Sequence, residues 1–183
     1  MLSAIIVAGG SSQRMGFDKL FAVIAGEPVI GHSIRAFERA TAVSEILVVA
    51  REQRHDEIRK ISSSAGFRKI RAIVPGGERR QDSVRAGLDQ IDRATKYVAV
   101  HDAARPLITP EQIERAFERC RVDGSAALVQ PVNDTLKRAN ADLLVVGSVD
   151  RHQLYAMDQC LSQPDALQHS LGIRAQSAVA RLI

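Results

Sequence analysis

The stretch LSAIIVAGGSSQRMGFDK, residues 2–19, joins a mostly apolar run of seven residues to a loop that begins with two glycines. An apolar run without polar alternation is typical of a strand that is buried on both faces of a parallel sheet. The loop matches neither common glycine fingerprint, because Phe17 stands where a Walker A loop has lysine and Ser12 where a dinucleotide loop has its second glycine. The stretch therefore predicts an α/β domain with a ligand loop of another kind.

Four further apolar runs follow along the chain, over residues 45–50, 69–74, 97–101 and 126–132. Apolar residues at helical spacing lie between them, after Pro28 as a first helical residue and again over residues 84–91. The clearest helix start is TPEQ, in which Thr109 is the expected N-cap and Gln112 completes a capping box. Repeated strand, helix, strand order predicts a doubly wound α/β fold, a mostly parallel Rossmann-like sheet with helices on both faces.

The composition is that of a globular protein, and its net charge suits an anionic partner without deciding which one. Of the 183 residues 45% are apolar, and 25 Lys and Arg against 21 Asp and Glu give a net charge of +4. With no Trp, two Tyr and five Phe, the chain lacks the aromatic series of nucleic-acid-binding surfaces, so we expect phosphorylated small molecules and no nucleic acid. Cys120 and Cys160 have no metal-ligand spacing, and we expect neither a zinc site nor a disulfide framework.

Residues 1–157 are expected to form one domain. Within it, about residues 133–155 carry two short strand-like runs around ANAD, which predict a β-hairpin arm. Residues 158–183 contain four glutamines and no convincing strand, and we expect a weak helix or a frayed tail there. No stretch approaches the length of a membrane span and no signal peptide is recognisable, so we expect a cytoplasmic protein with no membrane partner.

Four loops rich in glycine or charge follow predicted strands, over residues 9–19, 75–83, 102–106 and 133–138. Right-handed crossovers bring such loops to one edge of a doubly wound sheet, where ligands bind. In the first loop, Gly9 and Gly10 allow close backbone approach, and Arg14 and Lys19 add two cations, which suits a triphosphate. The alternative is a solvated turn with incidental charges, and this loop alone does not decide between the two.

The second loop, PGGERRQDSV, again follows glycines with cations, here Arg79 and Arg80, and Ser83 lies where the next helix opens. Its structural alternative is a turn that leads into a capped helix. On the predicted arm, Thr135 and Arg151 together suit a phosphate group on an acceptor substrate. The alternative is that these are charges on an exposed hairpin without a function, and the sequence alone slightly favours that alternative.

The third loop, HDAARP at residues 101–106, carries the sharpest signal. Asp102 ends a buried strand, where an unpaired charge is costly, and Mg²⁺ shared with phosphate oxygens would offset that cost. Arg105 can receive a second anion. The alternative is an Asp102 that pairs with Arg105 or caps the next turn. We expect His101 to be structural, because no carboxylate or serine pattern orients it, and Cys120 to be a core residue.

In order, the motifs AGGSSQRMGFDK, PGGERRQDSV, HDAARPLI, PVNDTLKR and SVDRHQLY resemble those of the 2-C-methyl-D-erythritol 4-phosphate cytidylyltransferases of the non-mevalonate isoprenoid pathway. The resemblance covers about residues 2–155. It implies a transferase that uses Mg²⁺, in which the 4-phosphate of methylerythritol attacks the α-phosphorus of CTP to give a CDP-alcohol, 4-diphosphocytidyl-2-C-methyl-D-erythritol, and pyrophosphate. The attacking phosphate is already an anion, so catalysis needs alignment and charge neutralisation rather than a strong base.

The resemblance also implies roles for individual positions. Its triphosphate loop falls on Ala8, Gly9, Gly10, Ser12, Arg14 and Lys19. Arg14 and Lys19 would neutralise the charge that builds on the phosphates. Its cytosine and ribose contacts fall on Gly77, Ser83 and Ala103, while Asp102 would bind both nucleotide and metal. Arg105, Thr135 and Arg151 match the acceptor positions, the last two also counted as catalytic, on an arm that crosses to the partner subunit of a homodimer.

After VDRHQLYAM the chain reads DQCLSQ, where the family continues with a TPQ motif, a helix and a late substrate-binding lysine. We therefore expect a C-terminal part that is missing or altered from about Asp158, and hypothesise a shifted reading frame. Three alternatives to the cytidylyltransferase remain open: a ribitol-phosphate cytidylyltransferase, a nucleotidyltransferase of the molybdenum-cofactor type, and a CTP-binding remnant without turnover.

Overall fold

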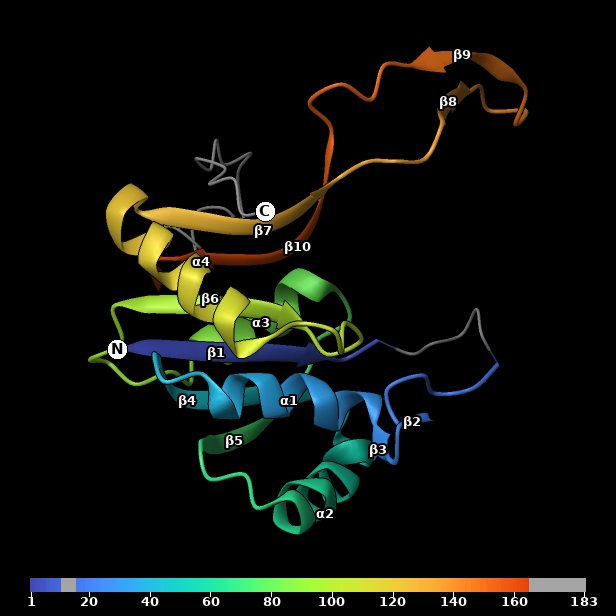
Figure 1. Cartoon of the computed structure of the whole chain (residues 1–183). Helices are drawn as coiled ribbons and strands as arrows, with labels where there is room; N and C mark the ends of the chain where they lie inside the picture. Colours follow the sequence, from blue (N-terminus) through green and yellow to red (C-terminus); the bar gives the residue numbers. More distant parts are fainter. Residues whose placement is uncertain (11–15, 165–183) are drawn as a thin grey trace.

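The computed structural model describes residues 1–10 and 16–164. Their main feature is a six-stranded sheet in the order β5, β4, β1, β6, β10, β7 (Figure 1). The strands are β1 (Leu2–Ala8), β4 (Val43–Ala50), β5 (Ile70–Pro75), β6 (Tyr97–Asp102), β7 (Ser125–Pro131) and β10 (Tyr155–Ser162). β1 pairs in parallel with β4 and β6, and β4 with β5, whereas β10 runs antiparallel to both its neighbours.

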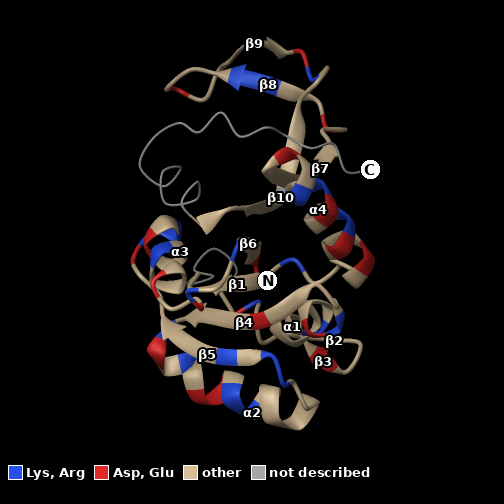
Figure 2. Cartoon of the chain, turned by 90° about the vertical axis from the view of Figure 1, so that its left-hand side faces the viewer, with Lys and Arg blue, Asp and Glu red and all other residues tan. Residues whose placement is uncertain are grey.

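Helices cover both faces of this sheet, as the sequence predicts (Figure 2). One face packs against α1 (Val29–Arg39), α2 (His55–Ala65) and α4 (Pro110–Asp123) and forms the larger apolar core. The opposite face packs against α3 (Arg80–Leu88) and forms a smaller core. A 3₁₀ turn (Glu52–Arg54) precedes α2, and a short hairpin of β2 (Val23–Ile24) and β3 (Glu27–Pro28) precedes α1. Among the described residues no helix combines the length and the apolar character needed to cross a membrane.

The predicted helix start at Thr109 is confirmed. The Thr109 hydroxyl accepts a hydrogen bond from the Gln112 backbone N–H at 3.3 Å, and the Gln112 side chain accepts one from the Thr109 N–H at 3.0 Å. Pro28 differs slightly from its prediction, because it is the N-cap of α1 rather than the first helical residue.

The predicted arm is also confirmed, as a separate two-stranded sheet of β8 (Leu136–Ala139) and β9 (Val145–Val149) that projects away from the main sheet (Figure 1). The expectation of no strand beyond Asp158 is wrong. β10 continues to Ser162 and fills the space between β6 and β7, where Leu161 is fully buried. The remaining residues of the predicted tail, 165–183, lie outside the described part of the chain.

A buried carboxylate, Glu45, links several strands near their N-terminal ends. The predicted site lies at the opposite, C-terminal ends of these strands. Glu45 on β4 is 6% exposed and accepts hydrogen bonds from the Ser3 hydroxyl at 2.5 Å, the Arg71 guanidinium at 2.7 Å and the Asp92 backbone N–H at 3.0 Å. Burial raises the pKa of Glu45, but the hydrogen bonds from Asp92, Ser3 and Arg71 outweigh it, so the pKa lies below its ordinary value. Glu45 thereby ties three strands to the loop before β6.

We expect Glu45→Gln to lower the free energy of unfolding by roughly 2 kcal/mol at pH 7, because it removes the charge from a fully hydrogen-bonded buried acceptor. Since the folded-state pKa is lowered, this contribution is present above the unfolded-state pKa and is lost as the pH falls through the folded-state value. Urea unfolding between pH 7 and pH 3, on the wild type and the variant, measures the difference.

Glu118→Gln is the matched control, because Glu118 is an exposed carboxylate that pairs with Arg121 at 3.2 Å. Its unfolding free energy should stay within about 0.5 kcal/mol of the wild type. A Glu45→Gln effect no larger than this, or one that grows toward pH 3, would contradict the account of Glu45.

Candidate active site

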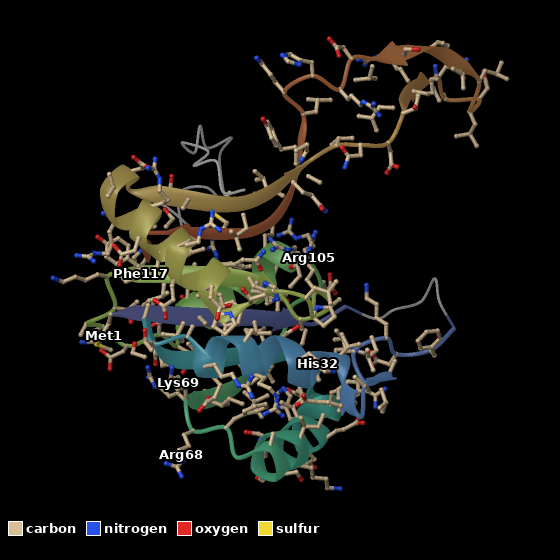
Figure 3. All side chains as sticks on the ribbon, viewed as in Figure 1. Met1, His32, Arg68, Lys69, Arg105 and Phe117 are labelled. Atoms are coloured by element: carbon tan, nitrogen blue, oxygen red, sulfur yellow. The ribbon has the colours of Figure 1, made fainter. Side chains whose placement is uncertain are left out.

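The candidate site lies where β1 and β6 end, at the point of the sheet where the strand order reverses. Their pairing is parallel and places Val7 beside Asp102, so the loops that follow both strands leave the same edge. Figure 3 shows Arg105 at this edge, and Met1 and Phe117 at the opposite one. Ligands of doubly wound folds bind in the crevice outside such a reversal.

The first two glycine loops meet at Ser83. A Cβ atom at Gly9 would lie 3.2 Å from the Ser83 Oγ, and one at Gly76 would lie 3.1 Å from the same atom. The loop after β1, the loop after β5 and the start of α3 are thus in van der Waals contact. This is the convergence that the sequence predicts for the loops of residues 9–19 and 75–83.

Ser83 and Ala103, predicted to contact the cytosine and ribose, are both buried. Ser83 is 2% exposed, and its hydroxyl accepts a hydrogen bond from the Gly77 N–H at 3.1 Å. Ala103 is fully buried, its N–H donates to the Val7 carbonyl at 2.9 Å and its carbonyl accepts from Ser33 at 2.9 Å. In this structure Ser83 holds the Gly77 loop, and Ala103 holds the loop after β6 against β1. Their nucleotide contacts stay predictions.

Position 77 has no room for a side chain, so it requires glycine. A Cβ atom at Gly77 would lie 2.4 Å from the Asp82 Cβ, well inside any real contact. Asp82 closes this turn, because its carboxylate accepts hydrogen bonds from the Arg79 backbone N–H at 3.2 Å and from the Arg79 guanidinium at 2.9 and 3.0 Å. The hydrogen bonds from Arg79 also lower the pKa of Asp82. The predicted alternative for this loop, a turn leading into a capped helix, is therefore present together with the convergence at Ser83.

Asp102 is paired, and this corrects the argument that its charge lacks a structural partner. The Arg80 guanidinium donates to the Asp102 Oδ1 at 3.0 and 2.9 Å, and the Arg105 Nε lies 3.6 Å from the Oδ2. The ion pair with Arg105 was the predicted alternative. Arg80, on α3, is a partner that the sequence analysis did not connect with Asp102, because the two are brought together only by the crossover of α3.

The residues present fit a magnesium ion that is shared with a nucleotide. Enzymes of phosphoryl transfer usually hold Mg²⁺ through one or two carboxylates and the oxygens of the substrate phosphates. Asp102 supplies one carboxylate, 32% exposed, at the mouth of the site. Among the described residues no cluster of three or more Asp, Glu, His and Cys could form an all-protein cage. The donor set therefore suits a metal that arrives with the triphosphate.

The first loop is described in part. Ala8 ends β1, Gly9 and Gly10 follow it, and Lys19 is exposed after Gly16, whose φ is +70°. Ser12 and Arg14 lie outside the described residues. A glycine suits the left-handed conformation at position 16, which turns the chain back toward the sheet before Lys19.

His101 and Cys120 are structural, in agreement with the sequence analysis. His101 is 1% exposed, its Nε2 donates to the Arg105 carbonyl at 3.1 Å, and its ring lies 5.1 Å from the Phe37 ring. Burial lowers the pKa of His101 to about 4, so the ring is neutral at pH 7. Cys120 is fully buried, and burial raises its pKa to about 11, which leaves a weakly nucleophilic thiol.

Thr135 and Arg151 lie apart from the other predicted residues. Both are exposed, and the arm that follows Thr135 forms a sheet of its own, beyond β7 and β10 (Figure 1). The Arg151 guanidinium donates to the Asn133 carbonyl, so the two sides of the arm are joined at its base. The loops after β1 and β6 and the arm residues are therefore two halves of the predicted site, carried by different parts of the chain.

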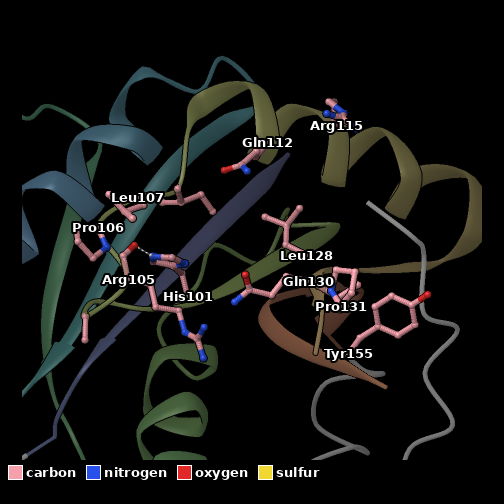
Figure 4. A pocket seen from close by; sticks show the side chains of 13 residues that line it. His101, Arg105, Pro106, Leu107, Gln112, Arg115, Leu128, Gln130, Pro131 and Tyr155 are labelled. Carbon is pink, nitrogen blue, oxygen red and sulfur yellow. Dashed lines mark hydrogen bonds between the residues drawn. The ribbon is translucent and has the colours of Figure 1, made fainter. Parts of the chain in front are cut away.

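A cavity of about 710 Å³ lies beside Arg105, between the loop after β6, the start of α4 and the base of the arm (Figure 4). Its lining includes His101, Gln130 and Tyr155. Sequence analysis missed this cavity, because β10, which brings Tyr155 beside Pro131, was not recognised as a strand. The cavity is continuous with the predicted acceptor residue Arg105.

Comparison with known proteins points in one direction. The sequence model of the family described as IspD, 2-C-methyl-D-erythritol 4-phosphate cytidylyltransferase, matches residues 2–177. A curated protein of this name from Pelotomaculum thermopropionicum is 36% identical over 177 residues, which cover 95% of this chain and 73% of that protein. Another from Alkaliphilus metalliredigens is 34% identical over 159 residues, which cover 85% of this chain and 66% of that protein.

Solved structures agree on the fold. A crystal structure titled 4-diphosphocytidyl-2C-methyl-D-erythritol synthase matches with a TM-score of 0.76 and 28% identity, over 93% of this chain and 79% of that one. The corresponding synthase from Anaerococcus prevotii matches with a TM-score of 0.77 and 22% identity, over 97% and 78%.

The family match corrects the predicted extent of the resemblance. It runs to residue 177, not to about residue 155, so the residues after Asp158 are matched in the reading frame as it stands. The hypothesis of a shifted frame is therefore wrong. The chain spans about two thirds to three quarters of the length of these two curated relatives.

We expect Gly77→Ala to lower the free energy of unfolding by about 1–3 kcal/mol, because the added Cβ forces the loop away from Asp82. Gly147→Ala is the control, since a Cβ built at that exposed arm residue meets nothing within 4 Å. Chemical unfolding of both variants and the wild type measures the effect. Equal stability of all three proteins would show that the close contact at Gly77 is not a constraint.

Proposed function

Since the chain belongs to the 2-C-methyl-D-erythritol 4-phosphate cytidylyltransferase family, we propose that it transfers CMP from CTP to 2-C-methyl-D-erythritol 4-phosphate. The products are 4-diphosphocytidyl-2-C-methyl-D-erythritol and pyrophosphate. The observation that carries the proposal is the meeting of the two glycine loops at Ser83, beside the strand end that bears Asp102. A triphosphate at this edge would face backbone N–H groups and cations.

The reaction needs charge neutralisation more than proton transfer. A phosphate oxygen of the acceptor forms a bond to the α-phosphorus while the bond from that phosphorus to the bridging oxygen of the leaving pyrophosphate breaks. Lys19 and Arg14 then stabilise the charge that develops on the α-phosphate and on the leaving group. His101, neutral and bonded through Nε2, takes no part in this step.

Asp102 would hold the magnesium ion together with triphosphate oxygens. When bound, the metal supplies a Lewis acid that offsets phosphate charge. Asp102 must then exchange at least one of its guanidinium partners for the metal, and Arg80, 56% exposed, is free to turn toward the phosphates that arrive with it. Arg105 would receive the phosphate of the acceptor.

The arm supports the further proposal of a homodimer. Four successive residues at its tip are strongly exposed and apolar: Leu143 at 85%, Leu144 at 63%, Val145 at 65% and Val146 at 59%. Such a run is unfavourable in water and typical of a surface that a protein partner covers. We propose that the arm docks on a second copy and brings Thr135 and Arg151 to the acceptor phosphate of the partner's site.

We expect Lys19→Ala to reduce the rate of pyrophosphate release from CTP by about 10²-fold, with a smaller change in the KM for CTP, because Lys19 acts mainly on transition-state charge. Release is measured with Mg²⁺ and CTP, with and without methylerythritol phosphate. Lys60→Ala, an exposed lysine on α2, is the control and should match the wild type.

Other outcomes of this assay would indicate another function, or another role for Lys19. Release that depends on ribitol phosphate would indicate a cytidylyltransferase for another acceptor. CTP binding without release under any acceptor would indicate a remnant without turnover. Normal turnover by Lys19→Ala would contradict the role given to that residue.

A second test asks whether the arm acts on the partner's site. Lys19→Ala and Arg151→Ala should each be nearly inactive alone. Co-expressed, they should recover about a quarter of wild-type activity, because half of the dimers are mixed and each mixed dimer has one intact site. Activity of the purified mixture measures this recovery.

The control pair is Lys19→Ala with Asp102→Asn, in which both changes fall on the same body of the chain. No mixed dimer of that pair has an intact site, so its activity should stay at the level of the single variants. Equal activity of the two mixtures would argue against an arm that crosses between subunits.

A further inference from the structure

Asp18 is an almost buried carboxylate in the first loop, directly before Lys19. Its side chain is only 11% exposed. The Arg51 guanidinium donates to the Asp18 Oδ2 at 2.8 Å, and the Arg54 guanidinium approaches the same oxygen at 3.1 Å through Nε and 3.0 Å through Nη2. Both arginines belong to the segment that follows β4, so the carboxylate joins two loops at the site edge.

The two arginines are themselves held from other sides. Arg54 also pairs with Glu57 at 2.8 Å, and its guanidinium lies 4.6 Å from the centre of the Phe21 ring. Arg51 directly follows β4, whose last residue pairs with Ala8. The partners of Asp18 are therefore fixed to the same sheet that carries the glycine loop.

Asp18 also fixes the backbone directly after Lys19. Its Oδ1 accepts a hydrogen bond from the Leu20 N–H at 3.3 Å, and its carbonyl accepts one from the Phe21 N–H at 3.1 Å. Leu20 is 4% exposed and belongs to the larger core. Lys19, exposed, thus stands between a clamped carboxylate and a buried leucine.

We propose that Asp18 is a positioning residue for Lys19, which it aims at the phosphates through its pairing with Arg51 and Arg54. The proposal rests on the function proposed above, in which Lys19 neutralises phosphate charge. A lysine on an unconstrained loop must lose conformational entropy when it contacts the phosphates in the transition state. A lysine on a turn that is already held by hydrogen bonds and ion pairs has lost much of this entropy on folding. The carboxylate of Asp18 is already neutralised by two guanidinium groups, so it competes less with an anionic ligand for Lys19.

A double-mutant cycle tests this proposal. Asp18→Asn should reduce kcat about tenfold and change the KM for CTP by less than about threefold, because the geometry of Lys19 matters most in the transition state. In the Lys19→Ala background the same change should have almost no further effect. A merely structural role would instead reduce activity equally in both backgrounds, and that result would overturn the proposal.

The two arginines that pair with Asp18 give a second set of variants, in case Asp18→Asn fails to fold. Arg51→Gln combined with Arg54→Gln should reproduce the loss of kcat, and again only when Lys19 is present. The matched control is Asp56→Asn, which breaks an exposed ion pair with Arg59 of 2.6 Å on α2. A control effect as large as that of Asp18→Asn would overturn the proposal.

The same cycle separates this proposal from the proposed function. If the wild type binds CTP without releasing pyrophosphate, the function fails, and the cycle is then measured on the Kd for CTP by calorimetry. Asp18→Asn should then weaken CTP binding by no more than about threefold, and only when Lys19 is present. If turnover is normal and Asp18→Asn slows it while Lys19→Ala does not, the function stands and the positioning role falls.

Discussion

The structure depends on the burial of β1 between two parallel partners. Leu2, Ala4, Ile5 and Ile6 are fully buried, and they contribute to the apolar cores on both faces of the sheet. α3 lies so close to this strand that a Cβ atom at Gly87 would approach the Ile5 Cγ2 to 2.7 Å. That contact sets the position of α3, and so of Ser83 and Arg80 at its other end. The geometry of the candidate site is therefore a consequence of core packing on β1.

Much of this fold can be predicted from the sequence, because fully buried parallel strands produce continuous apolar runs and Thr109 produces a capping box by local chemistry. β10 was missed, since its pairing with β6 and β7 is decided by strands far away in the chain rather than by its own pattern. α2 was not singled out, because Ile58 is its only buried residue and its apolar signal is weak. Tertiary contacts, not local preferences, define both elements.

In the candidate site, too, some features follow from local sequence motifs and others only from contacts between distant parts of the chain. Asp102 and the glycine loops are visible as motifs, and their place at the strand ends follows from the α/β pattern. The arginines that pair with Asp102 and Asp18 cannot be recognised from the sequence, because Arg80 lies on α3 and Arg51 directly follows β4. The buried state of Ser83 and Ala103 is likewise a property of three-dimensional packing, since both are small residues, one in the first turn of α3 and one in the loop after β6. Motifs thus identify the chemistry, and packing assigns each residue its present contacts.

Two aspartates at the site edge are each paired with two arginines, yet their surroundings give them different capacities to change partners. Asp18 is 11% exposed, and both of its guanidinium partners lie within 3.1 Å. Asp102 is 32% exposed, and its second partner, Arg105, lies at 3.6 Å. Breaking the pairs of Asp18 would leave a nearly buried charge uncompensated, which is costly, whereas Asp102 can exchange an arginine for another cation in partial contact with water. The pairing of Asp18 with two arginines is therefore suited to fix the loop, whereas the looser pairing of Asp102 is compatible with the exchange of an arginine for the metal ion proposed above.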